Sequence, residues 1–260
     1  MKIATCVRIG AIAVLATLVL ASTGWAVVVP IVVGPFEFCA PAEYDGNFVE
    51  VRRGSEINSA DCALNFTGLT GAAGDTWLTR YNNSAAPGDI FNTFQGLCLS
   101  ADVLISKFNN AKGGGLVALL NTNPGGKGLF LLLINSGNTD RLTLNTIDPN
   151  NGKIVQLPNA SVPLRSAIVE NAWYRLNVVM NAQDSSDTLS VFATVRRHTN
   201  PSDPSDATVD GEIGNPLEFN GSLHGQGLQQ SGYVGMAAWA KSAVVNTSIT
   251  NFFAGAPCFD

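Results

Sequence analysis

Three acidic residues near the N-terminus, Glu43, Asp45 and Glu50, have the side chains that glycoside hydrolysis requires. That reaction uses two carboxyl groups about 5 to 10 Å apart. Glu43 and Asp45 share the parity of one strand face, but Glu50 has the opposite parity. Gly46 and Asn47, which lie between them, are typical turn residues. The spacing therefore favours a turn with solvated acids over a catalytic pair.

The two histidines, His198 and His224, are the residues best suited to general-base or metal chemistry. Each lies in a polar stretch with Gly or Pro, so we place both in loops. Their spacing differs from H-E-x-x-H, and no G-x-S-x-G elbow accompanies them. The pattern supports neither a zinc protease nor a serine hydrolase.

Aspartates recur in the segments between apolar runs. They are Asp140, Asp148, Asp184, Asp187, Asp203 and Asp206. Calcium takes six to eight oxygen ligands, which such loops supply when they converge. Turns and solubility require acidic loops as well. We expect no cofactor, and calcium is the alternative.

Several aromatic residues are able to stack on a sugar ring. They are Trp77, Tyr81, Trp173, Tyr174 and Trp239. Rings in a β-sandwich belong more often to the core. In "NAWYRLNVVMN", Tyr174 shares parity with Leu176, which predicts a buried ring. Trp173 has the opposite parity at the strand entrance, so it is the one residue that we retain as a ligand-binding candidate.

The elements that must position these residues are strands. Apolar residues alternate with polar ones along 99–105, 142–144, 174–180 and 189–195. The last two segments flank the polar "NAQDSSD" and predict a hairpin. "GLVALLN", "GLFLLLIN" and "YVGMAAWA" are nearly all apolar, as in strands covered on both faces. Roughly a dozen strands without a long helix predict an all-β antiparallel sandwich.

Glycine-rich stretches occur at Gly113-Gly114-Gly115 and in "NPGGKG". Neither precedes a helix or has the spacing of a phosphate-binding loop. We interpret both as hairpin turns.

The first 26 residues have the order of a secretory signal peptide. Lys2 and Arg8 precede the apolar run 9–20, and small residues follow it up to Ala26. The run is shorter than the about 20 residues of a membrane span. We therefore expect a secreted, periplasmic or cell-surface protein with no membrane insertion after cleavage. An irregular, disulfide-containing extension (27–93) and a sandwich domain (94–260) would follow the signal peptide (1–26).

Cleavage would remove Lys2 and Arg8 but no acidic residue, so the formal charge would change from −5 to −7. An acidic chain without a basic stripe argues against nucleic acid as a partner. Four cysteines would remain, Cys39, Cys62, Cys98 and Cys258. An even number in an exported chain predicts two disulfides, and three pairings are open.

The order of these segments resembles a known family. "SADVLISKF", "GGGLVALLN", "NAWYRLNVVMN", "DTLSVFATV" and "GYVGMAAWAKSAVVNTSITNFFAG" are similar to strands of the concanavalin A-like, laminin-G-like jelly rolls of exported bacterial proteins. The resemblance covers roughly residues 94–255. Relatives often bind calcium through an Asp before the closing Asn-Phe, where this chain has Thr250.

The resemblance implies a fold more than an activity, because this fold carries lectins, adhesion modules, glycoside hydrolases and polysaccharide lyases. Since catalytic signatures are missing, we expect a non-catalytic recognition or surface module that contacts polysaccharide, cell-surface glycan or cell-envelope components. One alternative is a carbohydrate-active enzyme, either a glycoside hydrolase or a polysaccharide lyase. A second is a structural matrix or surface-layer component, and the oligomeric state is open.

Overall fold

The computed structural model describes residues 31–52, 56–69, 76–81, 91–92, 96–106, 111–121, 127–136, 139–148, 150–151, 153–182, 187–203, 208–241 and 244–258. The expected signal peptide lies outside these residues, as do Asp184, Asp206 and the side chain of Trp77. None of the helices in the described ranges is long and apolar enough to span a bilayer.

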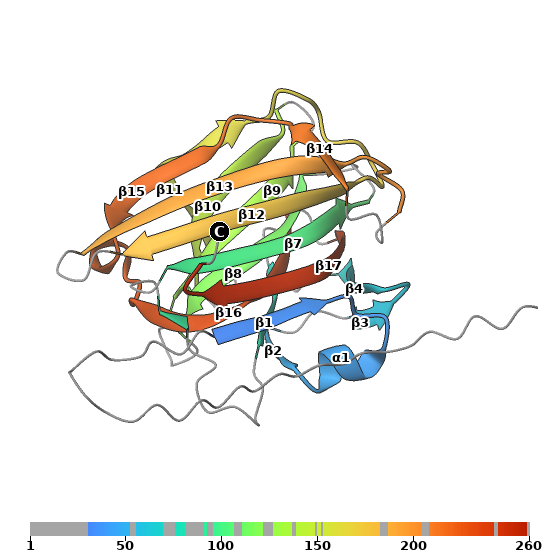
Figure 1. The fold of residues 1–260 in the computed structure, drawn as a ribbon, viewed down its shortest axis with the longest axis horizontal. Coiled ribbons are helices and arrows are strands. Elements are labelled where there is room, and N and C mark those ends of the chain that lie inside the picture. The colour runs from blue at the N-terminus through green and yellow to red at the C-terminus, as the bar shows by residue number, and fades with distance from the viewer. Residues whose placement is uncertain are drawn as a thin grey trace, which may run out of the picture.

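One layer of the molecule is a nine-stranded sheet. Its main path is β14 (Val209–Glu212), β13 (Thr188–His198), β12 (Trp173–Ala182), β7 (Leu97–Ile105), β17 (Val244–Ala256), β4 (Ala63–Leu69) and β3 (Glu56–Ala60). In addition, β1 (Ile31–Phe36) pairs with β17, and β15 (Leu217–Ser222) pairs with β13. Figure 1 shows the outer face of this sheet toward the viewer.

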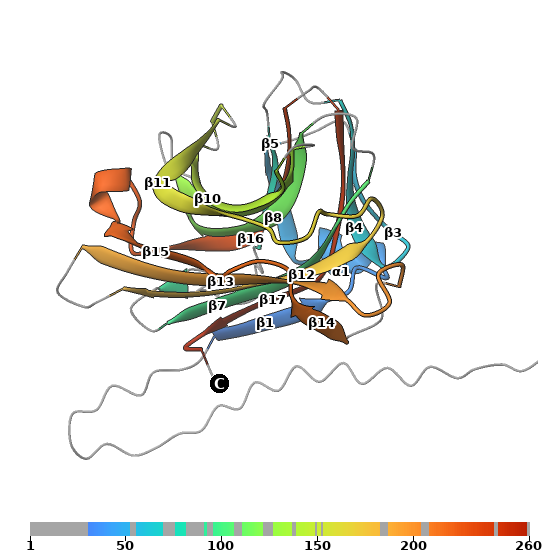
Figure 2. The same ribbon diagram turned by 90° about the horizontal axis from the view of Figure 1, so that it is seen from above.

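The second layer is an eight-stranded sheet. Its path is β11 (Ile154–Pro163), β10 (Arg141–Ile147), β9 (Gly128–Asn135), β8 (Lys112–Leu120), β16 (Ser231–Ala240), β5 (Thr76–Tyr81) and β2 (Phe48–Arg52), and β6 (Phe91–Asn92) pairs with β16. It curls over the first sheet (Figure 2). The strand pairs in both sheets are antiparallel, so the predicted antiparallel sandwich is confirmed.

The segment 31–92 contributes strands to both sheets. β1, β3 and β4 belong to the nine-stranded sheet, whereas β2, β5 and β6 belong to the other. A short helix, α1 (Pro41–Asp45), precedes β2, and Gly46 and Asn47 form the expected turn after it. These strands raise the number in the described part of the chain to 17. Their weak alternation of apolar and polar residues explains why the sequence predicts only about a dozen.

The predicted hairpin of β12 and β13 is confirmed by its pairing. Leu176 lies opposite Val195, and Met180 lies opposite Val191. Tyr174, Leu176, Val178 and Met180 are each at most 1 % exposed, as their parity predicts. The hydroxyl of Tyr174 accepts a hydrogen bond of 2.7 Å from the backbone N–H of Val169. Tyr174 is therefore an anchor of the sheet.

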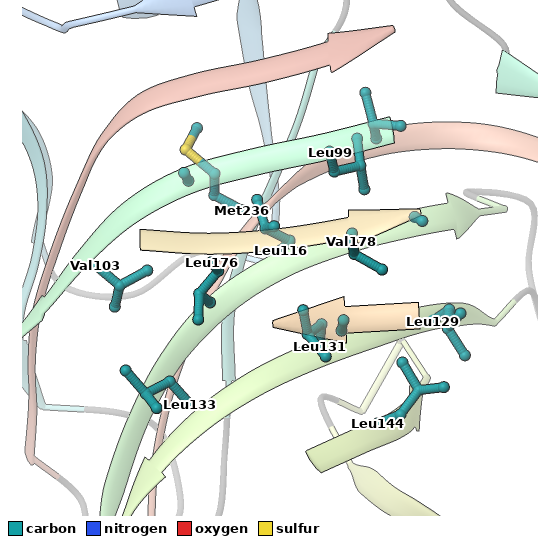
Figure 3. Packing of buried hydrophobic residues seen from close by; sticks show 14 of the residues in the cluster. Leu99, Val103, Leu116, Leu129, Leu131, Leu133, Leu144, Leu176, Val178 and Met236 are labelled. Atoms are coloured by element: carbon teal, nitrogen blue, oxygen red, sulfur yellow. The ribbon is translucent and has the colours of Figure 1, made fainter. Parts of the chain in front are cut away.

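The core lies between the two sheets (Figure 3). Leu176 and Val178 from β12 and Leu99 from β7 face Leu116 from β8 and Leu131 from β9. All five side chains are at most 2 % exposed. Interdigitation of two apolar faces is what an aligned sandwich requires.

Replacing Leu176 by alanine is expected to lower the free energy of unfolding by about 2 to 4 kcal/mol, because it leaves a cavity between the sheets. Val179→Ala is the matched control, since Val179 is half-buried on the outer face of the same strand. It should cost about 1 kcal/mol or less. Urea denaturation measures both values. Equal costs would mean that the assigned faces are wrong.

The eight-stranded sheet also buries its other face. Val117, Phe130 and Leu132 alternate with the core residues of β8 and β9 and form a second apolar cluster with Leu78 and Ala237. Each is at most 1 % exposed. The nearly continuous apolar runs therefore reflect strands covered on both faces, as predicted.

The triple glycine lies within β8, so its interpretation as a hairpin turn is wrong. Close packing explains the residue type. A Cβ at Gly114 would lie 2.4 Å from Cγ2 of Thr247 in the other sheet, and one at Gly115 would lie 1.8 Å from the carbonyl oxygen of Leu131. Side chains here would push β8 away from its neighbours.

The four cysteines form two disulfides, Cys39–Cys62 and Cys98–Cys258. The first joins the segment after β1 to the turn between β3 and β4, within the N-terminal part of the chain. The second joins β7 to the residues after β17. The prediction of two disulfides is confirmed, and the structure selects one of the three pairings.

Candidate functional site

A buried ion pair on the nine-stranded sheet is the centre of the candidate site. Asp102 of β7 lies directly opposite Arg175 of β12 in the strand register. Their neighbours Ala101, Val103 and Leu176 face the core, so alternation turns Asp102 and Arg175 to the outer face. The Asp102 side chain is nevertheless 0 % exposed, and that of Arg175 is 24 % exposed.

Three side chains surround the Asp102 carboxylate. Arg175 donates from Nε to Oδ1 at 2.8 Å and from Nη2 to Oδ2 at 2.7 Å. Asn251 donates from Nδ2 to Oδ2 at 2.6 Å. The Nε2 atom of His198 lies 2.8 Å from Oδ1, and its side chain is also 0 % exposed. The two-pronged contact fixes the guanidinium plane.

Burial acts to raise the pKa of Asp102, but the hydrogen bonds from His198, Arg175 and Asn251 and the charge of Arg175 outweigh it. The pKa therefore lies below the ordinary value for this residue. Asp102 stays ionised at neutral pH and compensates the charge of Arg175.

A β-bulge directs Asn251 to this carboxylate. The register between β17 and β7 shifts between Thr250 and Phe253, and Asn251 has a φ of 51°. Bulges redirect side chains, and Asn tolerates the left-handed region better than most residues. The residue type is the one sequence signal that marks this bulge.

Our prediction that His198 lies in a loop is wrong, because β13 extends to this residue. Beyond the 2.8 Å contact between Nε2 and Asp102, neither ring nitrogen of His198 has a hydrogen-bond partner in the described part of the chain. The buried ring of His198 contacts Asp102 and is not among the residues that line the cleft beside the ion pair.

The cleft beside the ion pair has a volume of about 620 Å³. Its lining residues come from β7, β12, β17, β1 and the segment joined by the first disulfide. They are Pro35, Glu37, Cys39, Cys62, Ser100, Arg175, Asn177, Thr250, Asn251 and Phe253. A volume in this range accommodates a small ligand or a few sugar units.

Phe253 supplies the aromatic ring of the cleft. It is half-buried, and its ring packs over Gly255, where a Cβ would lie 3.2 Å from Cζ. The glycine therefore leaves room for the ring on the strand. Amide and hydroxyl groups of Asn177 and Ser100 lie in the same lining. An aromatic ring beside hydrogen-bonding amide and hydroxyl groups is suited to the C–H face and hydroxyls of a sugar.

Thr250, which stands where the resemblance to the concanavalin A-like family implies a calcium-binding Asp, has a structural contact here. Its side chain is buried, and Oγ1 donates toward the backbone carbonyls of Glu37 at 3.0 Å and Cys62 at 2.8 Å. These contacts tie the disulfide-linked wall of the cleft to β17. The hydroxyl thus positions backbone rather than presenting a carboxylate to a cation.

The aspartates considered as calcium ligands make local contacts. Asp140 accepts a hydrogen bond of 2.6 Å from the backbone N–H of Ile168, and Asp148 accepts one of 2.9 Å from that of Asn150. Asp203 donates its backbone N–H to the carbonyl of Asn200. Within the described ranges, no group of three or more His, Cys, Asp or Glu residues is placed to hold a metal ion.

His224 and Asp187 form a separate surface pair after β15. Nδ1 of His224 lies 2.5 Å from Oδ1 of Asp187, and their side chains are 70 % and 38 % exposed. The backbone and side-chain hydrogen bonds of His224 hold the pKa of Asp187 below its ordinary value. Ser222 donates to Asp187 rather than to the histidine. The arrangement closes a turn and lacks the geometry of a nucleophilic triad.

Trp173, the ligand-binding candidate from the sequence, lies at the start of β12 and is only 4 % exposed. Its backbone N–H donates to the carbonyl of Pro201 at 2.8 Å. It is absent from the lining of the cleft. Its role in ligand binding stays a prediction.

No family model matches the chain, and a search of curated proteins finds no match. Lectin I from Ulex europaeus, solved with the methyl glycoside of α-L-fucose, is 12 % identical with a TM-score of 0.45, over 88 % of this chain and 98 % of the lectin. The metal-free carbohydrate recognition domain of Emp46p is 10 % identical with a TM-score of 0.48, over 87 % of this chain and 95 % of that domain.

A GH43 protein from Bacillus licheniformis, BlXynB, is 12 % identical with a TM-score of 0.44, over 91 % of this chain and 40 % of that one. The chain spans 35 % of another GH43 glycoside hydrolase. Lectins and glycoside hydrolases thus both occur among the solved structures with a similar fold. At TM-scores below 0.5, these similarities do not identify a binding residue.

Proposed function

We propose that this protein is an exported, non-catalytic recognition module that binds glycan in the cleft on the outer face of the nine-stranded sheet. The observation that carries the proposal is the cleft lining itself, where the ring of Phe253 lies beside the polar side chains of Ser100, Arg175 and Asn177. The buried Asp102, opposite Arg175 on the adjacent strand, holds the guanidinium in place. A preorganised polar wall reduces the cost of ordering on binding.

The arrangement of charges supports recognition over catalysis. Hydrolysis of a glycosidic bond requires two carboxyl groups on either side of the substrate. Glu37 is the one acid among the cleft-lining residues, and Asp102 is buried in an ion pair behind them. The two disulfides support an oxidising, extracytoplasmic location.

Replacing Asn177 by alanine is expected to weaken glycan binding about two- to tenfold, because one hydrogen bond contributes about 0.5 to 1.5 kcal/mol and about 1.4 kcal/mol corresponds to a factor of ten. Asn181→Ala is the matched control, since Asn181 is exposed on the same face of β12, four residues beyond, and outside the cleft lining. A glycan array followed by calorimetry, with and without calcium, measures the affinities.

Absence of binding to any polysaccharide would refute glycan recognition. Equal losses of glycan affinity in the Asn177→Ala and Asn181→Ala variants would show that the binding site lies outside the cleft. Concentration-dependent self-association on size-exclusion chromatography, without glycan binding, would favour a structural matrix component instead.

A further inference from the structure

The charges around the cleft determine which class of glycan it accepts, given the recognition role proposed above. Arg175 is the one cationic side chain in the lining, and Glu37 is the one anionic side chain there. The remaining lining residues are uncharged. The relative affinity for neutral and acidic ligands therefore depends on how much of the charge of Arg175 is left uncompensated at the cleft surface.

Asp102 compensates most of that charge. Its two oxygens accept from Nε and Nη2 of Arg175 at 2.8 and 2.7 Å, and the carboxylate is fully buried. An arginine paired in this way can still donate well-oriented N–H hydrogen bonds to a ligand. Its charge is largely neutralised, so it attracts a second anion only weakly. His198 adds no charge to the cleft surface, because its side chain is 0 % exposed and it is outside the lining.

The exposed Glu37 therefore makes the net charge of the cleft negative. With Asp102 and Glu37 against Arg175, the formal charge of the group is −1. On the neighbouring strand, Arg196 lies opposite Arg175 in the register, with its Nη2 3.7 Å from Oε1 of Glu212, and it is not part of the cleft lining. A uronate would meet the Glu37 carboxylate without an uncompensated cation to balance it.

We infer that the cleft binds an uncharged glycan, a neutral hexose or pentose chain, and discriminates against uronate-containing polysaccharides. The ring of Phe253 faces the C–H groups of the sugar, and the side chains of Ser100 and Asn177 bond its hydroxyls. Glu37 is the residue that excludes acidic chains. Its carboxylate also accepts hydrogen bonds from hydroxyl groups of a neutral sugar. In an acidic sugar, repulsion between the two carboxylates offsets these hydrogen bonds.

The test uses the purified protein and oligosaccharides of one length in two classes: neutral hexasaccharides of glucose, mannose and xylose, and hexagalacturonate. Calorimetry at 20 and 500 mM NaCl measures the affinities. We expect a neutral hexasaccharide to bind at least ten times more tightly than hexagalacturonate. The affinity for the neutral hexasaccharide should change less than twofold between the two salt concentrations, because no ion pair is screened.

Glu37→Gln provides the second arm. It is expected to improve the affinity for hexagalacturonate at least threefold at 20 mM NaCl, and to change it little at 500 mM. Glu218→Gln is the matched control, because Glu218 is exposed on β15 in the same sheet and is not part of the lining. The control should leave all affinities unchanged.

The outcomes separate this inference from the proposed function. Tighter binding of hexagalacturonate than of the neutral hexasaccharides would overturn the inference while leaving glycan recognition intact. Binding of no oligosaccharide in any class would overturn both.

Discussion

Replacing Cys98 and Cys258 by serine is expected to lower the free energy of unfolding by about 5 kcal/mol. This disulfide spans 160 residues, and the chain entropy that a crosslink removes from the unfolded state grows with the length of the closed loop. It also fastens the end of the chain to β7, beside Gly255 of β17. Urea denaturation of the oxidised protein and the double variant measures the difference.

The disulfide Cys39–Cys62 is the internal control. It closes a loop of 23 residues, for which the same relation gives about 3 kcal/mol. The Cys39→Ser/Cys62→Ser variant should therefore be more stable than the Cys98→Ser/Cys258→Ser variant. The reverse order would show that local contacts, and not loop length, determine what each crosslink contributes.

The hairpin of β12 and β13 was predictable because its information is local. Alternate residues of a strand face opposite sides, so Leu176 and Val191 could be assigned to the core from their neighbours alone. The polar residues between the two strands indicate the reversal of the chain. The same logic identified β7 and β10.

The ion pair at the candidate site was not predictable in this way. Asp102 and Arg175 are 73 residues apart, and they meet only because β12 lies beside β7 in the sheet. Strand order is a non-local property that alternation does not encode. An isolated Asp among apolar residues, in "SADVLISKF", was the available signal, because a buried carboxylate needs a partner.

His198 shows where the local pattern was available and was not used. Alternation of inward and outward residues continues beyond Val195, and Arg196 and His198 fall on the outer face with Thr194. The following Pro201 and Pro204 suggested an earlier end of the strand. Composition of the loop outweighed the periodicity of the strand in our prediction, which began the loop at His198, whereas the strand includes that residue.

Replacing Asp102 by alanine is expected to destabilise the protein by about 3 to 5 kcal/mol at pH 7. The loss of the carboxylate leaves Arg175, Asn251 and His198 without their common acceptor, and removal of one partner from a buried ion pair costs about this much. Asp210→Ala is the control, because Asp210 is exposed on β14 and should change stability by about 0.5 kcal/mol or less.

A comparison of the protein with its Asp102→Asn variant at decreasing pH tests whether the charge of Asp102 provides this stability. The variant retains the shape of the side chain without its charge. Because the folded pKa of Asp102 is lowered, its ionised form contributes in full above the ordinary pKa of about 3.9. The contribution is lost as the pH falls from that value through the folded pKa. The difference in unfolding free energy between the protein and Asp102→Asn should therefore be constant from pH 7 to 5 and shrink below pH 4. A difference that stays constant down to pH 2 would show that packing of the side chain, and not its charge, stabilises the sheet.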